Sequence, residues 1–420
     1  MRAMSWLRPI LLVFMPLAAG YYLSYLFRVI NAVVAAPLVD DLGLDATRLG
    51  LLSSVYFLTF AAIQLPLGAA LDRFGPRRVQ GTLLLLAAAG AVTFACASDL
   101  TGLLIGRALI GLGVAGALMA GLKAIAEWFP KQRIALVNGA FIALGAAGAV
   151  TATAPVEWIL GRLDWRRLFL LLAATTAVVS LLILLLVLEP PKRSALASSR
   201  PLAIRTIYAD PSFWRVAPLS AMCIGSAWAL QGLWAAPWLA DVAALGRSEI
   251  VRHLFVMAVA LCVGALLIGV VADTLRRHDV SPTSVLTTTA STFLAAELAL
   301  VFRLPIPSTV LWALVAGMGA GTVLSYALIA DLFPKEVAGR ANAALNILHI
   351  GGAFAIQAGI GVIVGLWHRD PYGHYPPNAY AAAFLIIVLL QFLALLWFLS
   401  PHWRTWQSLI TGTRLGLDRS

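Results

Sequence analysis

A lone arginine in an apolar segment is the residue of this sequence best suited to bind a ligand. Tyr21, Ser24, Arg28 and Asn31 recur at helical spacing and form one polar stripe. Neither their own segment nor the next apolar segment carries an acid. Since a buried guanidinium without a partner is untenable, either a distant acid or an anionic ligand must pair with Arg28. Its forked geometry suits carboxylate and phosphate.

A second polar stripe lies far along the chain. Asn342, Asn346, His349 and Gln357 fall within about one quadrant of a helical wheel. His349 is the only histidine deep inside an apolar segment, and histidine can change charge near physiological pH. It is therefore a candidate proton carrier, with a hydrogen-bonded structural histidine as the alternative.

Lys123 has two readings. It can present a second positive charge to a ligand, or it can pair with Glu127, one helical turn further on. Because sixteen residues separate it from Arg107, these two cations point to nearly opposite sides of a straight helix.

Signatures of enzymes are lacking. The sequence contains no GxSxG, HExxH or CxxC and no P-loop, so we expect neither catalysis nor ATP hydrolysis. The three cysteines lie inside apolar runs, which argues against a disulfide framework or a metal cluster. We expect no cofactor, and any energy that the protein uses must come from an ion or solute gradient.

The composition indicates a membrane protein. Hydrophobic residues make up 61% of the chain and charged residues 12%, and the mean hydropathy is +0.90. Soluble proteins are closer to half apolar and a quarter charged. The net charge of +11 fits cytoplasmic loops of a membrane protein better than a nucleic-acid partner.

The hydropathy pattern predicts twelve membrane-spanning helices. We place them at residues 11–38, 47–71, 79–98, 101–128, 134–160, 167–188, 213–240, 250–274, 283–303, 308–333, 339–367 and 379–400. Residues 189–212 are rich in proline, serine and basic residues and read as a cytoplasmic linker between two halves.

The two halves are related in sequence. Residues 125–148 read IAEWFPKQRIALVNGAFIALGAAG, and residues 329–352 read IADLFPKEVAGRANAALNILHIGG. Glu127 falls opposite Asp331, and both segments end a helix at Phe-Pro-Lys before another begins. Duplicated apolar halves are typical of transporters, in which two similar bundles rock about a site between them.

The distribution of basic residues predicts the orientation. With both termini in the cytoplasm, the inner segments hold nineteen Lys and Arg residues and the outer segments eight. We expect Glu157 and Glu297 near the outer ends of their spans, in surface ion pairs with Arg162 and Arg303.

The turn after span 2 carries the most specific motif. Residues 68–78 have the pattern GxxxDRxGxRR, which resembles the signature loop of the major facilitator superfamily between helices 2 and 3. The motif residues are Gly68, Asp72, Arg73, Gly75, Arg77 and Arg78. The matching turn of the second half keeps Asp273 and a basic pair but loses the Arg and Gly that should follow.

These residues can form a latch at the cytoplasmic side. Gly68 allows close approach of helices, and Asp72 can sit against a helix N-terminus. We expect the three arginines of the loop to pair with Glu127 and hold that side shut in one state. A plain positive-inside turn is the alternative.

Span 4 provides a second resemblance. Its LxxxRxxIGLG stretch is similar to the family pattern around a helix-4 arginine, with Ile110 where glutamine is common. Arg107 is thus a candidate for coupling or for structure within the bundle, although it can also extend to the nearby outer surface.

The resemblance also points to a substrate class. In this family helices 1, 2, 4, 5, 7, 8, 10 and 11 line the cavity. The stretch YLSYLFRVINAV resembles helix 1 of organophosphate and organic-anion permeases, in which an arginine binds the anion. The second arginine expected in span 7 is missing, and Gln231 and Trp234 occupy that region, which favours a carboxylate over a phosphate ester.

The sequence thus predicts an all-α membrane protein with twelve transmembrane helices in two pseudo-symmetric six-helix bundles. The bundles are residues 1–188 and 213–420, with the linker 189–212. We expect an ion- or proton-coupled secondary transporter of a small organic anion, working by alternating access. A proton-coupled exporter of hydrophobic or amphiphilic compounds is the alternative, while a membrane enzyme or a channel lacks supporting motifs. We expect a monomer in a bacterial inner membrane, with both termini cytoplasmic and no nucleic-acid partner.

Overall fold

The computed structural model describes residues 8–188 and 204–400, in which all regular secondary structure is helical, without strands. The first half contains η1 (Ile10–Phe14), α2 (Met15–Val29), α3 (Asn31–Leu42), α4 (Ala46–Ala95), α5 (Leu100–Val114), α6 (Ala117–Trp128), η2 (Lys131–Arg133), α7 (Ile134–Thr151), α8 (Ala154–Leu160) and α9 (Trp165–Leu186). The second half contains α10 (Ile204–Tyr208), α11 (Pro211–Ala229), η3 (Leu230–Trp234), α12 (Ala235–Asp241), α13 (Arg247–Arg277), α14 (Pro282–Val301), α15 (Ser308–Gly321), η4 (Thr322–Leu324), α16 (Ser325–Leu332), α17 (Lys335–Val364) and α18 (Pro377–Leu399).

The described residues contain eleven helical stretches long and apolar enough to cross a membrane, and one of them crosses twice. That stretch is α4, whose 50 residues are interrupted at Gly75 by a backbone with φ 78° and ψ 164°. At 1.5 Å per residue, 50 residues would extend about 75 Å, more than twice the hydrocarbon thickness. Gly75 therefore supplies the reversal between spans 2 and 3, in a conformation that side chains rarely adopt. The twelve predicted crossings are confirmed.

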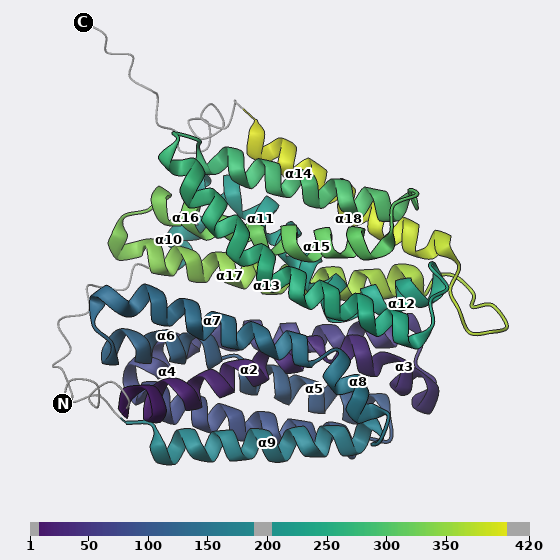
Figure 1. The fold of residues 1–420 in the computed structure, drawn as a ribbon, viewed down its shortest axis with the longest axis horizontal. Coiled ribbons are helices and arrows are strands. Elements are labelled where there is room, and N and C mark those ends of the chain that lie inside the picture. Colours follow the sequence, from purple (N-terminus) through teal and green to yellow (C-terminus); the bar gives the residue numbers. More distant parts are fainter. Residues whose placement is uncertain (1–7, 189–203, 401–420) are drawn as a thin grey trace, which may run out of the picture.

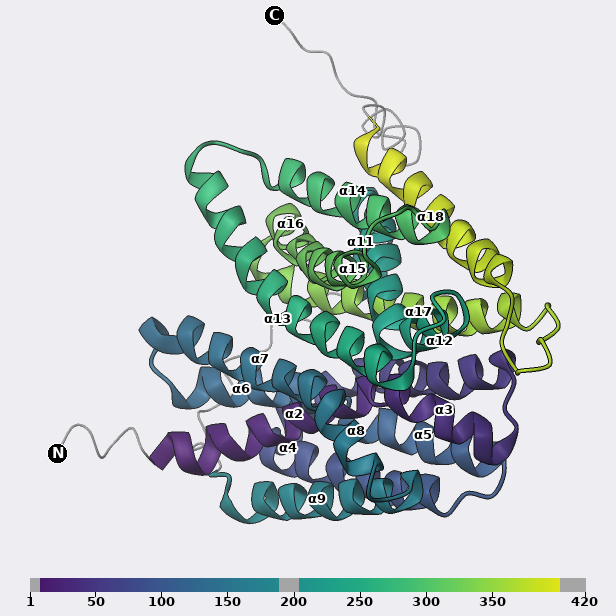
Figure 2. The same cartoon turned by 45° about the vertical axis from the view of Figure 1, so that its right-hand side comes forward.

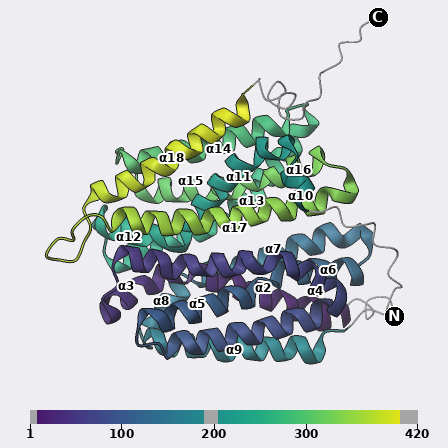
Figure 3. The ribbon, with the colours of Figure 1, turned by 180° about the vertical axis from the view of Figure 1, so that it is seen from behind.

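The helices form two bundles that lie side by side. Helices α2 to α9 make the lower bundle in Figure 1, and α11 to α18 make the upper one, with all the long helices running in roughly the same direction. Figure 3 shows the same division from behind, where α17 lies along the seam against α4. Of the predicted linker, residues 189–203 lie outside the described residues. Its end holds the short helix α10, whose Tyr208 hydroxyl donates to the Ala344 carbonyl at 3.0 Å.

Aspartates in the connecting turns begin several spans. The side chains of Asp45, Asp99, Asp164 and Asp210 each accept a hydrogen bond from a backbone N–H two or three residues further on. Such caps satisfy amide groups that have no partner inside the helix. They fix where each span enters the membrane.

The repeated Phe-Pro-Lys segments have the same backbone in both halves. Phe129 and Pro130 are extended after α6, and Phe333 and Pro334 are extended after α16. The proline disfavours a helical residue before it, so each helix ends there and the chain turns into the next. The sequence repeat is thus also a structural repeat.

The two bundles meet at one end of the molecule and separate at the other. At the end that carries Tyr375, a Cβ on Gly50 would lie 3.0 Å from the Gly361 Cα, so the helix backbones touch there. At the end that carries Gly75, a Cβ on Gly68 or Gly269 would have nothing within 4 Å. Figure 2 shows the bundles diverging on the left, where α7 begins and α13 ends. We call these the Tyr375 end and the Gly75 end.

The charge distribution predicts that the Gly75 end faces the cytoplasm. In intact cells, a membrane-impermeant maleimide should label Tyr372→Cys, which is exposed at the Tyr375 end, but not Asp279→Cys at the Gly75 end. Cys96, which is also exposed, is replaced by serine in both variants. Permeabilised cells, in which both positions should react, provide the control. Labelling of the Asp279 variant alone in intact cells would reverse the predicted orientation.

Candidate binding site between the two bundles

Arg28 lies at the seam between the bundles, halfway along the chain's first crossing. Its guanidinium carbon is 3.8 Å from the centroid of the Tyr25 ring and 4.8 Å from that of Trp228 on α11. Trp228 in turn stacks on Phe57 of α4, with centroids 6.2 Å apart. No carboxylate of the described residues forms an ion pair with Arg28, and its side chain is only half-buried. The cation is therefore held by aromatic faces and keeps N–H donors for another partner.

The predicted stripe on the first crossing divides into two faces. Ser24 donates to the Val114 carbonyl at 3.3 Å, and the Asn31 amide donates to Ser53 at 2.8 Å, both inside the first bundle. In this structure Ser24 and Asn31 thus face neighbouring helices of the first bundle, and their place in the binding face stays a prediction. A helical wheel groups residues within a quadrant, but small polar side chains at its edge bond to neighbouring helices instead.

The face that remains is aromatic. Tyr21 stacks on Phe141 of α7 and meets the edge of Tyr25, with centroids 5.1 and 5.2 Å apart. Tyr25 was missed by the sequence analysis, although Tyr21, Tyr25 and Arg28 follow the i, i+4, i+7 spacing of one helix face. Trp228 was also missed, because nothing local in the sequence places it opposite Arg28.

The second bundle contributes a hydrogen-bonded polar cluster. His349 is fully buried, with its Nε2 atom 2.6 Å from the Ser220 hydroxyl and its Nδ1 atom 3.0 Å from the Tyr326 hydroxyl. Tyr326 donates to the Asn346 carbonyl oxygen at 2.8 Å, and Ser220 donates to Ser325 at 2.6 Å. The cluster joins α11, α16 and α17, so its members fix the side chains of three helices that face the first bundle.

Tyr326 connects this cluster to the aromatic face. It is half-buried, and it lies close enough to Tyr25 for an electrostatic interaction across the seam. Asn346 is also half-buried. We use the name mid-seam cluster for Tyr25, Arg28, Trp228, Tyr326 and Asn346, which combine one cation, aromatic rings and polar donors from both bundles.

Three predicted residues lie between the mid-seam cluster and the Tyr375 end. The Trp234 indole donates to the Gln357 carbonyl at 3.0 Å, and its ring edge lies against Gly50 and Gly361, at the tightest contact of the bundles. Gln231 is buried, and its Nε2 atom has no hydrogen-bond partner among the described residues. Gln231, Trp234 and Gln357 thus belong to the closed side of the seam.

Lys123 does not join the binding site. Its ammonium group lies 2.5 Å from the Asp72 carboxylate and 3.0 Å from the Leu71 carbonyl, so it ties span 4 to the turn after span 2. Neither reading of the sequence predicted this pairing, because Lys123 and Asp72 are 51 residues apart.

The arginines of the turn do not form the predicted latch in this structure. Arg77 donates to the Leu184 carbonyl of α9 at 2.7 Å, and Arg73 lies over the ring of Phe74. Glu127 forms no ion pair within the described ranges, and nothing packs against Gly68. Arg77, Arg73 and Asp72 instead contact α9, Phe74 and Lys123, so the turn is tied within the first bundle and not to Glu127.

The equivalent acids of the second half behave differently. Asp273 pairs with Arg277 of its own helix at 3.0 Å, so it ties no second helix to the turn. Asp331 is exposed and forms no ion pair with any described residue.

Arg107 is buried and does not extend to the surface. Its side chain is 1% exposed and lies over the Tyr56 ring at 4.8 Å. Its Nε and Nη1 atoms have no hydrogen-bond partner among the described residues. Its guanidinium thus contacts Tyr56, which is not a residue of the mid-seam cluster.

The bundles are fastened together at the Tyr375 end. Arg247 of α13 pairs with Glu157 of α8 at 2.5 Å and donates to the Val33 carbonyl at 2.7 Å. The expected pairing of Glu157 with Arg162 was therefore wrong. The hydrogen bonds that join the described parts of the two bundles lie at this end.

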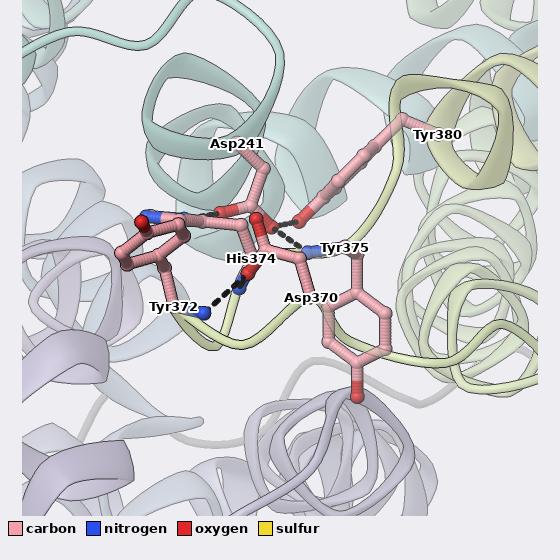
Figure 4. A network of polar contacts seen from close by, with 6 residues as sticks. All are labelled: Asp241, Asp370, Tyr372, His374, Tyr375 and Tyr380. Carbon is pink, nitrogen blue, oxygen red and sulfur yellow. Dashed lines mark hydrogen bonds and ion pairs between the residues drawn. The ribbon is translucent and has the colours of Figure 1, made fainter.

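The loop between α17 and α18, residues 365–376, also holds the two bundles together, and we call it the clasp. Its Arg369 donates to the Leu44 carbonyl at 2.7 Å, and its Tyr375 hydroxyl accepts from the Ala46 N–H at 3.0 Å. Figure 4 shows how the clasp is held: Asp241 accepts from His374 at 2.7 Å, from the Tyr375 N–H and from the Tyr380 hydroxyl. Asp370 accepts from the backbone N–H groups of Tyr372 and His374 within the loop. The Asp241 carboxylate at the end of α12 thus fixes the conformation of the clasp, which hydrogen-bonds to the first bundle.

The sequence matches a known family over most of its length. The profile described as Major Facilitator Superfamily matches residues 17–356. A probable sulfoacetate transporter, SauU, of Cupriavidus necator is 30% identical over 151 residues, which is 36% of this chain and 35% of that protein. The hexuronate transporter of Escherichia coli K12 is 28% identical over 151 residues, with the same shares of 36% and 35%. Each match thus spans about a third of the relative's length.

Solved structures share the fold. A bacterial homolog of the human lysosomal transporter Spinster, in an inward-facing and occupied conformation, superposes with a TM-score of 0.75 at 19% identity, over 96% of this chain and 97% of that one. A mutant of the nucleoside transporter NupG has a TM-score of 0.72 at 12% identity, over 91% of this chain and 98% of that one. At these identities the likeness concerns the fold.

Breaking the tie between spans 2 and 4 should slow transport without unfolding the protein. Asp72→Asn removes the partner of Lys123, and because Asp72 is largely exposed, the loss of stability should stay below about 1 kcal/mol. We expect transport about tenfold slower, since the turn must close against the second bundle in each cycle. Asp273→Asn is the matched control, because it breaks a pair within one helix. Wild-type rates in Asp72→Asn would exclude the gating role.

Loss of the Arg247 bridge should open the Tyr375 end. Arg247→Ala removes the Glu157 pair and the bond to Val33, which after solvent screening stabilise the closure by about 1 kcal/mol, or about fivefold in the equilibrium. Alkylation of Ala46→Cys, which is 3% exposed where its N–H meets the Tyr375 hydroxyl, should accelerate by that factor. Arg252→Ala, which breaks only an exposed pair with Glu249, should leave the alkylation rate unchanged. Equal rates in the two variants would contradict the assignment.

Proposed function

The chain belongs to the Major Facilitator Superfamily of membrane transporters, and we propose that it is a secondary transporter that carries a small organic anion by alternating access. The observation that carries the proposal is Arg28, a cation at the middle of a crossing with aromatic contacts and no ion pair among the described residues. A charge in the membrane interior is costly and is retained for a function by default.

An anion is the partner that Arg28 lacks. The notable acids near the seam are already engaged, since Glu157 pairs with Arg247 and Asp241 holds the clasp. The guanidinium can donate two parallel hydrogen bonds to a carboxylate or sulfonate, at about twice the strength of neutral bonds. The relatives named for sulfoacetate and hexuronate support the same substrate class.

A monoanionic headgroup fits the site better than a phosphate ester. Lys123 is paired with Asp72, and Arg107 is buried over the Tyr56 ring, so neither is placed in the mid-seam cluster as a second positive charge. The rest of the mid-seam cluster consists of Tyr25, Trp228 and Tyr326 with the Asn346 amide. Such a wall suits a carboxylate attached to a ring or to a short polar chain.

The asymmetry of the seam supports alternating access. The bundles touch at Gly50 and Gly361 and are apart at Gly68 and Gly269. If the Gly75 end is cytoplasmic, this is the inward-facing member of a pair of states. With no P-loop in the sequence, we infer that an ion gradient, most simply of protons, provides the energy. The buried position of His349 behind Tyr326 and Asn346 gives it the role of orienting these two side chains.

Export of amphiphilic compounds is the second candidate. The aromatic character of Tyr21, Tyr25, Trp228 and Phe57 favours it, because flat or cationic amphiphiles also bind such rings. The two functions differ in their need for Arg28: an anion requires the guanidinium, whereas a cationic amphiphile would be repelled by it.

Replacing Arg28 should therefore discriminate between them. Arg28→Ala should weaken binding of sulfoacetate or glucuronate by about 30-fold or more, the effect of losing about 2 kcal/mol of charge-assisted hydrogen bonding. Arg28→Lys should recover little, because lysine keeps the charge but not the fork. Binding is measured by ligand-induced thermal stabilisation of the purified protein, and counterflow in proteoliposomes measures transport.

The matched control is Arg252→Ala, an exposed arginine at the Tyr375 end. It should bind and transport as the wild type does. If Arg28→Ala bound the anions with unchanged affinity, or gained transport of cationic amphiphiles only, the anion function would be wrong.

A further inference from the structure

The second bundle contains a buried acid that the binding site does not use. Glu297 of α14 is 2% exposed, which contradicts the expected surface ion pair with Arg303, a residue that is itself exposed. Arg303 follows the end of α14 in a left-handed conformation, which turns the chain away from Glu297. The acid instead lies among α11, α14 and α18.

The surroundings of Glu297 are polar but uncharged. The Ser226 hydroxyl of α11 donates to Oε1 at 2.5 Å, the Cys223 thiol lies one turn earlier on the same helix, and Gln391 of α18 lies beside the carboxyl group. The second oxygen, Oε2, has no hydrogen-bond partner among the described residues. No Lys, Arg or His of the described residues forms an ion pair with the group.

This arrangement stabilises the protonated acid. A carboxylate with a bare oxygen and no cation would bear the full cost of burying a charge. A carboxylic acid avoids that cost, since Oε2 then carries the proton and Oε1 still accepts from Ser226. Within the described ranges, Glu297 is the only buried acid with an oxygen that lacks a partner.

Ser226 links Glu297 to the mid-seam cluster. On α11, Ser226 and Trp228 are two residues apart and therefore point about 200° from each other. Ser226 faces α14, whereas Trp228 faces Arg28 and Phe57 on the other bundle. The π-helical segment η3 begins two residues after Trp228. Such segments interrupt the regular hydrogen bonding of a helix and are frequent at functional sites.

We propose that Glu297 is the site that binds the coupling proton, and that the Ser226 hydrogen bond passes its protonation state through α11 to Trp228 and Arg28. The inference rests on the proposed gradient-driven transport and names the residue that takes the proton. In the state with the Tyr375 end closed, Glu297 holds the proton on Oε2. Release of this proton to water leaves a charged carboxylate, which the present packing does not stabilise. Helices α11 and α14 must therefore separate enough for water to hydrate it. Proton release and movement of Trp228 are then one event.

His349 is less suited to the role. Both of its ring nitrogens lie within hydrogen-bond distance of a hydroxyl group, Ser220 or Tyr326, whereas Oε2 of Glu297 has no partner among the described residues. Two of the acids at the Gly75 end, Asp72 and Asp273, are largely exposed and ion-paired, so their protonation would not be linked to the seam.

Two measurements on the purified full chain test the proposal, and the first needs no substrate. In infrared difference spectra between acidic and alkaline buffer, the carbonyl band of a buried carboxylic acid should be present in the wild type. It should be absent in Glu297→Gln and retained in Glu249→Gln, a control at an exposed acid. A band that survives Glu297→Gln would overturn the assignment.

The second measurement follows protons in proteoliposomes, with sulfoacetate and glucuronate as the anions added. Glu297→Gln is isosteric with the protonated acid, so counterflow should stay within about twofold of the wild type, while anion-driven proton uptake falls at least tenfold. Uptake of the anion by Glu297→Gln should also lose its dependence on external pH. Ser226→Ala, which keeps the acid but removes the link, should retain the infrared band and reduce proton uptake. Unchanged proton uptake in Glu297→Gln would overturn the proposal.

The two failures can be told apart. If the wild type moved neither anion, the proposed function would be wrong for these substrates, and the infrared band alone would decide whether Glu297 holds a proton. If the wild type moved the anion with protons and Glu297→Gln did so equally, the transporter would stand and this inference would fall.

Discussion

A charge inside a membrane must have a partner, and most of what this structure arranges follows from that constraint. Arg28 finds aromatic faces on both bundles but no ion pair among the described residues, so its donors remain for a ligand. Arg107 is buried and lies over the Tyr56 ring. Glu297 has one hydroxyl donor and one bare oxygen, so its charge is avoided by a proton. Each of these charged groups is thus either held by a ring, open to the seam or neutralised.

The two ends of the seam differ in how closely the two bundles approach each other. At the Tyr375 end, backbone contact at Gly50 and Gly361 brings the bundles close enough for Arg247 and Arg369 to reach partners across the seam. These are a few ion pairs and hydrogen bonds at the rim, partly exposed, and each is worth on the order of 1 kcal/mol. A closure made of small increments can be opened again by a ligand that prefers the other state.

The duplicated halves share a backbone conformation at their Phe-Pro turns but carry different charged and polar groups. Both end a helix at Phe-Pro, after Trp128 and after Leu332. Yet the turn of the first half is tied to span 4 through Asp72 and Lys123, whereas Asp273 of the second half pairs within its own helix. The first bundle supplies the cation of the seam, and the second supplies the polar cluster of His349 and the buried acid Glu297. A symmetric scaffold thus holds an asymmetric site.

The sequence by itself determined the crossings, the repeat and the importance of Arg28, because these depend on local composition, spacing and the cost of an isolated charge. Gly75 at the reversal and the caps of the spans also follow from local chemistry. Only the tertiary structure decided which side chains meet: Lys123 with Asp72, Glu157 with Arg247, Trp228 with Arg28, and Ser226 with Glu297. These partners lie 51 to 200 residues apart, and a helical wheel gives the direction of a side chain but not the neighbour that it faces. In this structure Ser24 and Asn31 bond within the first bundle for the same reason, since a neighbouring helix offers them a hydrogen bond that the periodicity of one helix does not show.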